Sequence, residues 1–198
     1  MGIKIAEQIE IIKRMVNEKF KIYLGEGLIA DFQCKFNPPA TIEEINQLEK
    51  DHKIAIPPDY KEFLLITNGM YLMDIMKFHS LNDIEMILDT GIYMQGVYPI
   101  AYINGDYIVI NSDDIVCRQY IYAGGHDTVD EFICLSASFE TFLDRLTSTN
   151  CNIYWDWYHS KIFYSFSGNY PDTKPTRYTS PVIYTKASLV VPNPPDNK

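Results

Sequence analysis

The sequence predicts an α+β domain, in which an antiparallel sheet is flanked by helices. Three observations lead to this prediction. Two capped helical segments lie in the first third of the chain, short β-rich segments separated by turn residues follow, and another capped helix comes after them. Strands joined by short turns pair antiparallel, and helices grouped before and after such strands are typical of α+β folds.

An extra N-terminal helix is expected within residues 1–30. Apolar residues recur there at spacings of three and four, which places them on one helix face. They are Ile5, Ile9, Ile12, Val16 and Phe20. Gly25 and Gly27 are expected to end the helix. We expect it to pack on the domain; a partner-binding or oligomerising helix is the alternative.

Two more helices are expected before the strands begin. Thr41 and Glu44 have the spacing of a capping box, in which each side chain bonds a free backbone N–H at the helix start. Pro58 suits the first turn of the next helix, because proline has no N–H to leave unpaired. Asn68-Gly69 then ends that helix, with glycine suited to a left-handed cap.

From residue 71 to residue 135 the pattern predicts strands. The clearest of them cover residues 100–103, 107–111, 116–122 and 132–135. Asn104-Gly105, between the first two, is a strong hairpin signal. A last helix is expected to begin after Ser138, its N-cap.

Charge divides the chain into three parts. Residues 1–30 carry a net charge of +1, residues 31–150 of −12 and residues 151–198 of +2. We therefore expect a core domain over residues 31–150, with the N-terminal helix and a C-terminal extension as additions. Ten residues of the extension are aromatic and it is rich in proline, which predicts one or two extra strands and a frayed tail.

Composition argues against several classes of protein. A net charge of −9 repels phosphate backbones, so no direct nucleic-acid binding is expected. No apolar run is long enough to span a membrane, and acidic residues interrupt any signal-peptide core. The four cysteines include no closely spaced pair, which favours reduced thiols in a cytoplasmic protein without a metal site or cofactor.

No catalytic residues are predicted. The four histidines form no metallohydrolase motif, and neither a nucleophile elbow nor a phosphate-binding glycine loop is present. His126-Asp127 beside Asp130-Glu131 permits a metal or acid–base cluster, although a polar turn is the preferred interpretation. An enzyme of unrecognised type is therefore the least favoured hypothesis.

One set of motifs resembles a known family. The motifs are Asn-Pro-Pro-Ala-Thr-Ile-Glu-Glu-Ile at residues 37–45, Leu-Glu at 48–49, Ile-Pro-Pro-Asp-Tyr-Lys-Glu-Phe-Leu at 56–64, Asn-Gly at 68–69 and Ser-Phe-Glu-Thr-Phe-Leu at 138–143. In this order they resemble the SUKH superfamily, the group around the fungal Smi/Knr cell-wall regulators and many bacterial immunity proteins. The chain departs from the family pattern at residues 70–73, where a glycine-rich or aromatic segment is usual, and in its C-terminal extension.

The resemblance implies a binding module rather than an enzyme. Many bacterial members are cytoplasmic immunity proteins that neutralise a cognate toxin, often a nuclease. The expected function is therefore stoichiometric inhibition of a cognate, basic protein toxin. The alternative is a non-enzymatic regulatory scaffold of cell-wall synthesis or signalling, like the fungal members. The sequence does not predict the oligomeric state.

Two groups of residues are predicted to bind the partner. Acidic residues in or beside predicted turns are expected to form one patch that steers a basic toxin: Asp106, Asp113, Asp114, Asp127, Asp130 and Glu131. Aromatic residues of the extension are the second group, since such side chains dominate interface hot spots: Trp155, Trp157 and Tyr158. The alternatives are solubilising turn residues for the acids and a strand packed on the core for the aromatics.

Overall fold

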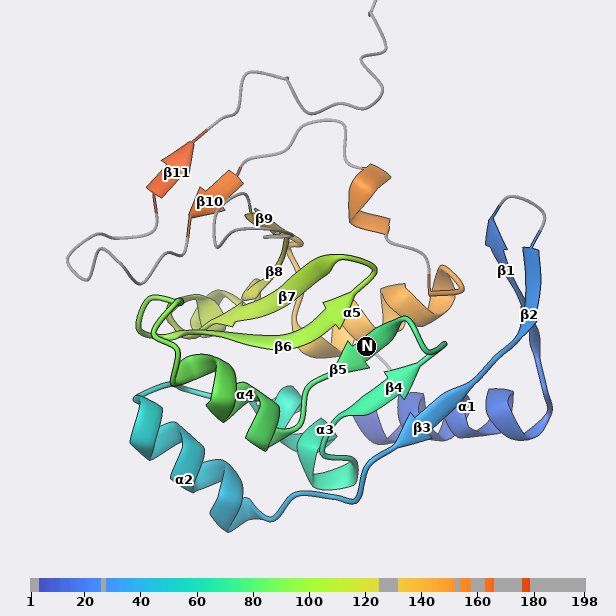
Figure 1. Cartoon of the computed structure of the whole chain (residues 1–198), viewed down its shortest axis with the longest axis horizontal. Helices are drawn as coiled ribbons and strands as arrows, with labels where there is room; N and C mark the ends of the chain where they lie inside the picture. Colours follow the sequence, from blue (N-terminus) through green and yellow to red (C-terminus); the bar gives the residue numbers. More distant parts are fainter. Residues whose placement is uncertain are drawn as a thin grey trace, which may run out of the picture.

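A computed structural model of the chain describes residues 4–25, 28–124, 132–151, 154–157, 163–165 and 176–178. Residues 24, 25, 28, 156, 157, 163–165 and 176–178 are described by their backbone alone. The described residues form helices interspersed with groups of strands (Figure 1). The α-helices are α1 (Ile5–Asn17), α2 (Ile42–His52), α3 (Pro58–Ile66), α4 (Leu81–Leu88) and α5 (Phe139–Ser148), and the 3₁₀ helices are η1 (Ser112–Cys117) and η2 (Tyr154–Trp157).

The strands among the described residues form two sheets. A separate hairpin pairs β1 (Lys21–Gly25) with β2 (Leu28–Asp31) and stands away from the main sheet (Figure 1). The main sheet runs in chain order through β3 (Cys34–Phe36), β4 (Met70–Leu72), β5 (Met76–Phe78), β6 (Val97–Ile103), β7 (Asp106–Asn111), β8 (Ile121–Gly124), β9 (Phe132–Cys134), β10 (Phe163–Ser165) and β11 (Thr176–Tyr178). Every neighbouring pair is antiparallel, so the α+β prediction is confirmed.

The larger of the two buried apolar clusters among the described residues is the main core, which lies between one face of this sheet and helices α1, α3 and α5. Phe78 on β5 illustrates the contact: its ring lies 5.9 Å from that of Phe63 on α3 and 6.4 Å from that of Phe142 on α5. Helix α1 adds Ile5, Ile9 and Ile12, each almost completely buried. Burying a side chain of this size contributes about 2 kcal/mol, so α1 is an integral part of the domain.

Three of the predicted caps and turns are present, but the left-handed cap expected at Asn68-Gly69 is not, because α3 already ends at Ile66 and its C-cap, Thr67, is extended. Thr41 and Glu44 make the reciprocal hydrogen bonds of a capping box at the start of α2. Ser138 accepts the N–H of Thr141 at the start of α5. Asn104 and Gly105 join β6 to β7 with positive φ angles of 48° and 100°, as a tight hairpin requires.

The first helix is shorter than predicted. It ends at Asn17, because Lys19 adopts a left-handed conformation and the chain turns into β1. Phe20, expected on the buried helix face, is 44% exposed. Its carbonyl accepts the N–H of Phe32, which closes the base of the β1–β2 hairpin.

Two further predictions are corrected between residues 71 and 135. The sequence predicts only strands there, but a Ser80–Asp83 capping box starts helix α4. The strand expected over 116–122 is shorter, because the Asn111 side chain accepts the N–H of Asp113 and the chain forms η1 before β8 begins.

Candidate protein-binding surface

The predicted acidic residues do not all meet at one end of the sheet. Asp106 is the first residue of β7, whereas Asp113 and Asp114 follow its last residue, Asn111. Six residues of strand span roughly 17–20 Å. These three acids therefore lie at opposite ends of β7 and form no single patch. Asp127, Asp130, Glu131 and Tyr158 lie outside the described residues, and Trp157 is described by its backbone alone.

Asp106 and Trp155 contact each other. Trp155, in η2, is 1% exposed, and its indole Nε1–H donates to Asp106 Oδ2 at 2.7 Å. Its ring also lies 6.2 Å from the ring of Phe142 on α5. Trp155 thus anchors the start of the C-terminal extension in the core. This is the packing role that was expected as the alternative to partner binding, but Trp155 lies in a 3₁₀ helix and not in a strand.

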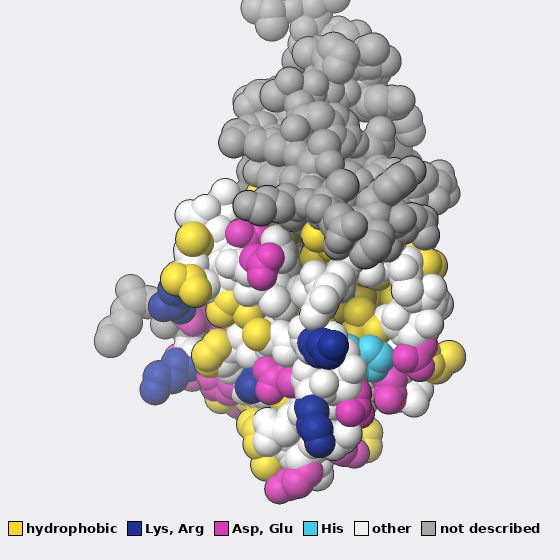
Figure 2. Space-filling view, turned by 90° about the vertical axis from the view of Figure 1, so that its left-hand side faces the viewer, with side chains coloured by type: hydrophobic (Ala, Val, Ile, Leu, Met, Phe, Trp, Pro, Cys, Tyr) yellow, Lys and Arg dark blue, Asp and Glu magenta, His cyan; other side chains and the backbone are white. Residues whose placement is uncertain are grey.

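The two acids at the other end of β7 differ in their surroundings. Asp114 Oδ2 accepts hydrogen bonds from Asn111 Nδ2 at 2.7 Å and from the Tyr122 hydroxyl at 2.6 Å, so part of its hydrogen-bonding capacity is used within the fold. Asp113 is exposed. Figure 2 looks at the end of the molecule where α2 and α4 lie, and there Asp and Glu side chains are interspersed with Lys and Arg.

The outer face of the sheet, opposite the core, carries a feature that the sequence did not reveal. Five residues on neighbouring strands are successive backbone partners and so lie in one line across the sheet. They are Lys35 on β3, Tyr71 on β4, Lys77 on β5, Tyr102 on β6 and Tyr107 on β7. Directly paired residues project from the same face of a sheet, so these five side chains lie next to one another on the outer face. We call them the tyrosine–lysine row.

Three residues of the row, Lys35, Tyr71 and Tyr102, are exposed, whereas Lys77 and Tyr107 are half-buried. Tyr71 and Tyr102 are 39% and 37% exposed, whereas their chain neighbours Leu72 and Ile103 point into the core and are fully buried. The rings of Tyr102 and Tyr107 meet edge to face at 5.1 Å, and Lys77 Nζ lies 5.9 Å from the centre of the Tyr71 ring. Both geometries are favourable and restrain these side chains.

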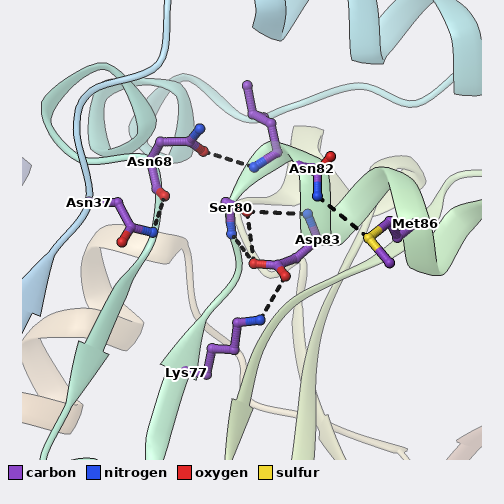
Figure 3. A network of polar contacts seen from close by, with 8 residues as sticks. Asn37, Asn68, Lys77, Ser80, Asn82, Asp83 and Met86 are labelled. Atoms are coloured by element: carbon purple, nitrogen blue, oxygen red, sulfur yellow. Dashed lines mark hydrogen bonds and ion pairs between the residues drawn. The ribbon is translucent and has the colours of Figure 1, made fainter.

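A polar network holds Lys77 in the middle of the row (Figure 3). Lys77 Nζ donates to Asp83 Oδ1 at 2.7 Å, and the other oxygen of Asp83 accepts the N–H and hydroxyl of Ser80. Partial burial alone raises the pKa of the Asp83 carboxyl, but these hydrogen bonds outweigh it and bring the pKa below its ordinary value. Burial acts against the charge of Lys77 too, yet its bond to Asp83 keeps its pKa raised. The pair is therefore ionised at neutral pH.

The same network fixes α4 against the segment that follows α3. Asn68 Oδ1 accepts the backbone N–H of Leu81 at 2.8 Å, and Asn37 Nδ2 donates to the Asn68 carbonyl at 2.8 Å (Figure 3). Asn68, which follows α3, thus positions the start of α4.

The described residues hold no group of three or more His, Cys, Asp or Glu side chains arranged to bind a metal ion. None of the described helices has the length and apolar character needed to cross a bilayer. What the described surface does offer is an ordered line of aromatic and cationic side chains, which suits binding.

Comparison with known proteins gives a consistent result. A family model described as the SMI1 / KNR4 family (SUKH-1) matches residues 39–145, more than half of the chain. The match leaves α1, the β1–β2 hairpin, β3, the last residues of α5 and the C-terminal extension outside.

Two proteins of Bacillus subtilis (strain 168) are also similar to the chain. YnaB is 32% identical over 128 residues, which cover 64% of this chain and 89% of YnaB. YobM is 27% identical over 162 residues, which cover 74% of this chain and 88% of YobM. Both are named as uncharacterized proteins and so carry no activity over to this chain.

Proposed function

This chain belongs to the SMI1/KNR4 family (SUKH-1), and from that membership we propose that it is an immunity protein. It acts in the cytoplasm by binding a cognate protein toxin and blocking the toxin's active site or the approach of its substrate. Family membership carries the proposal. It is supported by the exposed tyrosine–lysine row, because tyrosine is enriched where proteins bind each other.

The proposed partner is a basic protein, such as a nuclease toxin. A net charge of −9 favours its encounter with such a protein by long-range attraction. Asp113 is exposed and available for this role. Tight inhibition requires an affinity near nanomolar, about −12 kcal/mol.

Co-expression tests the proposal. The toxin domain encoded beside this gene is expressed from an inducible promoter, with or without this protein, and survival is counted. Protection against that domain, but not against an unrelated toxin of similar toxicity, is the expected result. If no toxin-like frame lies nearby, or cells die equally with and without the protein, the proposal fails and a regulatory scaffold like the fungal members becomes the better account.

A further inference from the structure

We infer that the tyrosine–lysine row is the surface on which the toxin docks, and that the toxin meets it with an apolar patch and one carboxylate opposite Lys35. This inference rests on the proposed function and specifies its binding site. The row joins five strands that lie side by side in the sheet, although their residues come from distant parts of the sequence.

The dimensions of the row fit a protein partner. Neighbouring strands lie about 4.8 Å apart, so the four steps from Lys35 to Tyr107 cover about 19 Å. A typical protein interface buries about 800 Å² on each partner, which corresponds to a patch roughly 28 Å across. The row therefore spans most of the width of such a patch. Small ligands instead favour concave pockets that enclose them.

Charge also selects a protein over a nucleic acid. Stacked aromatic side chains on a sheet hold single-stranded nucleic acids only together with a basic groove. Here the charge of Lys77 is compensated by Asp83, and the whole chain carries a net charge of −9. The phosphate backbone of a nucleic acid would be repelled.

Lys35 sets the polarity of the contact. It is exposed, and among the described residues no acidic side chain forms an ion pair with it, in contrast to Lys77. A carboxylate on the toxin at this end of the row would form an ion pair with Lys35. The net charge of −9 attracts the toxin from a distance, whereas the row makes the close contact, and the two roles predict different salt dependences.

The row is organised before the partner arrives. Lys77 is held by Asp83, and Tyr102 by its contact with the Tyr107 ring. Side chains that are already restrained lose less freedom on binding, which favours high affinity from few residues. Tyr71 and Tyr102, the most exposed tyrosines of the row, are therefore the expected hot spots.

The test is isothermal titration calorimetry of the full-length protein with the toxin domain encoded beside its gene. Tyr71→Ala and Tyr102→Ala should each raise the Kd about 30-fold, the size expected for a hot spot. The matched control is Tyr23→Ala, because Tyr23 is 53% exposed on the distant β1–β2 hairpin. Tyr102→Phe keeps the ring contact with Tyr107 and checks that any loss is not caused by misfolding.

A charge reversal tests the carboxylate. Lys35→Glu should weaken binding about tenfold, and Lys50→Glu, an exposed lysine on α2, should leave it within twofold. Urea unfolding of each variant verifies that the fold is intact.

Three outcomes separate this inference from the function on which it rests. Loss of affinity in the row variants alone supports both. If the wild type binds and the row variants bind equally well, the docking site is wrong while the immunity function stands. If the wild type does not bind the toxin domain, the proposed function fails and the inference fails with it.

Discussion

Protonation of His79 should make the stability of this protein depend on pH between neutrality and pH 4. His79 follows β5 and is 5% exposed, and neither of its ring nitrogens has a hydrogen-bond partner among the described residues. Burial disfavours the charged ring and lowers its pKa from 6.5 to about 4. Asp83 acts in the opposite direction and Lys77 in the same one, but burial has the largest effect.

The sign of the effect follows from the direction of this shift. Below pH 6.5 the unfolded chain binds a proton at His79 that the folded chain does not, so stability falls as the pH decreases toward 4. Each pH unit well inside this window removes about 1.4 kcal/mol. Between pH 7 and pH 5 the loss is therefore about 2 kcal/mol. Asp83, whose pKa is lowered from 3.8, adds its own loss only below this interval.

Urea unfolding of wild type, His79→Phe and His79→Leu, each at pH 7 and pH 5, measures this loss. Both variants should lack the 2 kcal/mol decrease, since neither side chain titrates. They fill the site differently, so their absolute stabilities will differ from each other while their pH dependence will not. A His79→Phe variant that loses as much stability as the wild type would refute the assignment.

Three other predictions concern the fold. Gly69→Ala should destabilise the protein by about 3 kcal/mol in thermal or urea unfolding, because the residue has a φ of +83° and an added Cβ would lie 2.6 Å from a carbonyl oxygen of β5; wild-type stability would contradict that close approach. Trp155→Phe should cost about 2 kcal/mol by the same measurement, since it removes a partly buried hydrogen bond and part of a buried ring; no change would mean that the extension is not anchored there. Cys117 is exposed and should react with a thiol reagent in the native protein. Burial raises the pKa of the Cys34 and Cys151 thiols to about 12, so these two should react only on unfolding. Rapid reaction of either thiol in the native protein would contradict this packing.

Features that depend on a few neighbouring residues could be predicted from the sequence. The capping box at Thr41, the Asn104-Gly105 hairpin and the Ser138 cap each follow from hydrogen bonds between residues at most three apart. Helix α4 has the same kind of signal in Ser80 and Asp83, but its eight residues are short and lie among β-rich segments, which obscured it.

The candidate surface depends on pairing between distant segments, which is why it was not predicted. Tyr71 and Tyr102 come together only because β5 lies between β4 and β6 in a particular register. Strands of three residues provide too little alternation to reveal a face from sequence. Trp155 is predicted to bind the partner only because tryptophan is common in interfaces. Its burial, which shows that it packs in the core, could be found only from the structure.

A stoichiometric titration of toxin activity tests the central claim most directly. The purified toxin domain encoded beside the gene is assayed on its substrate with increasing amounts of this protein. The account predicts that activity falls linearly and vanishes near one molar equivalent, as expected of a tight inhibitor acting by binding. Full toxin activity in a large molar excess of this protein would contradict it.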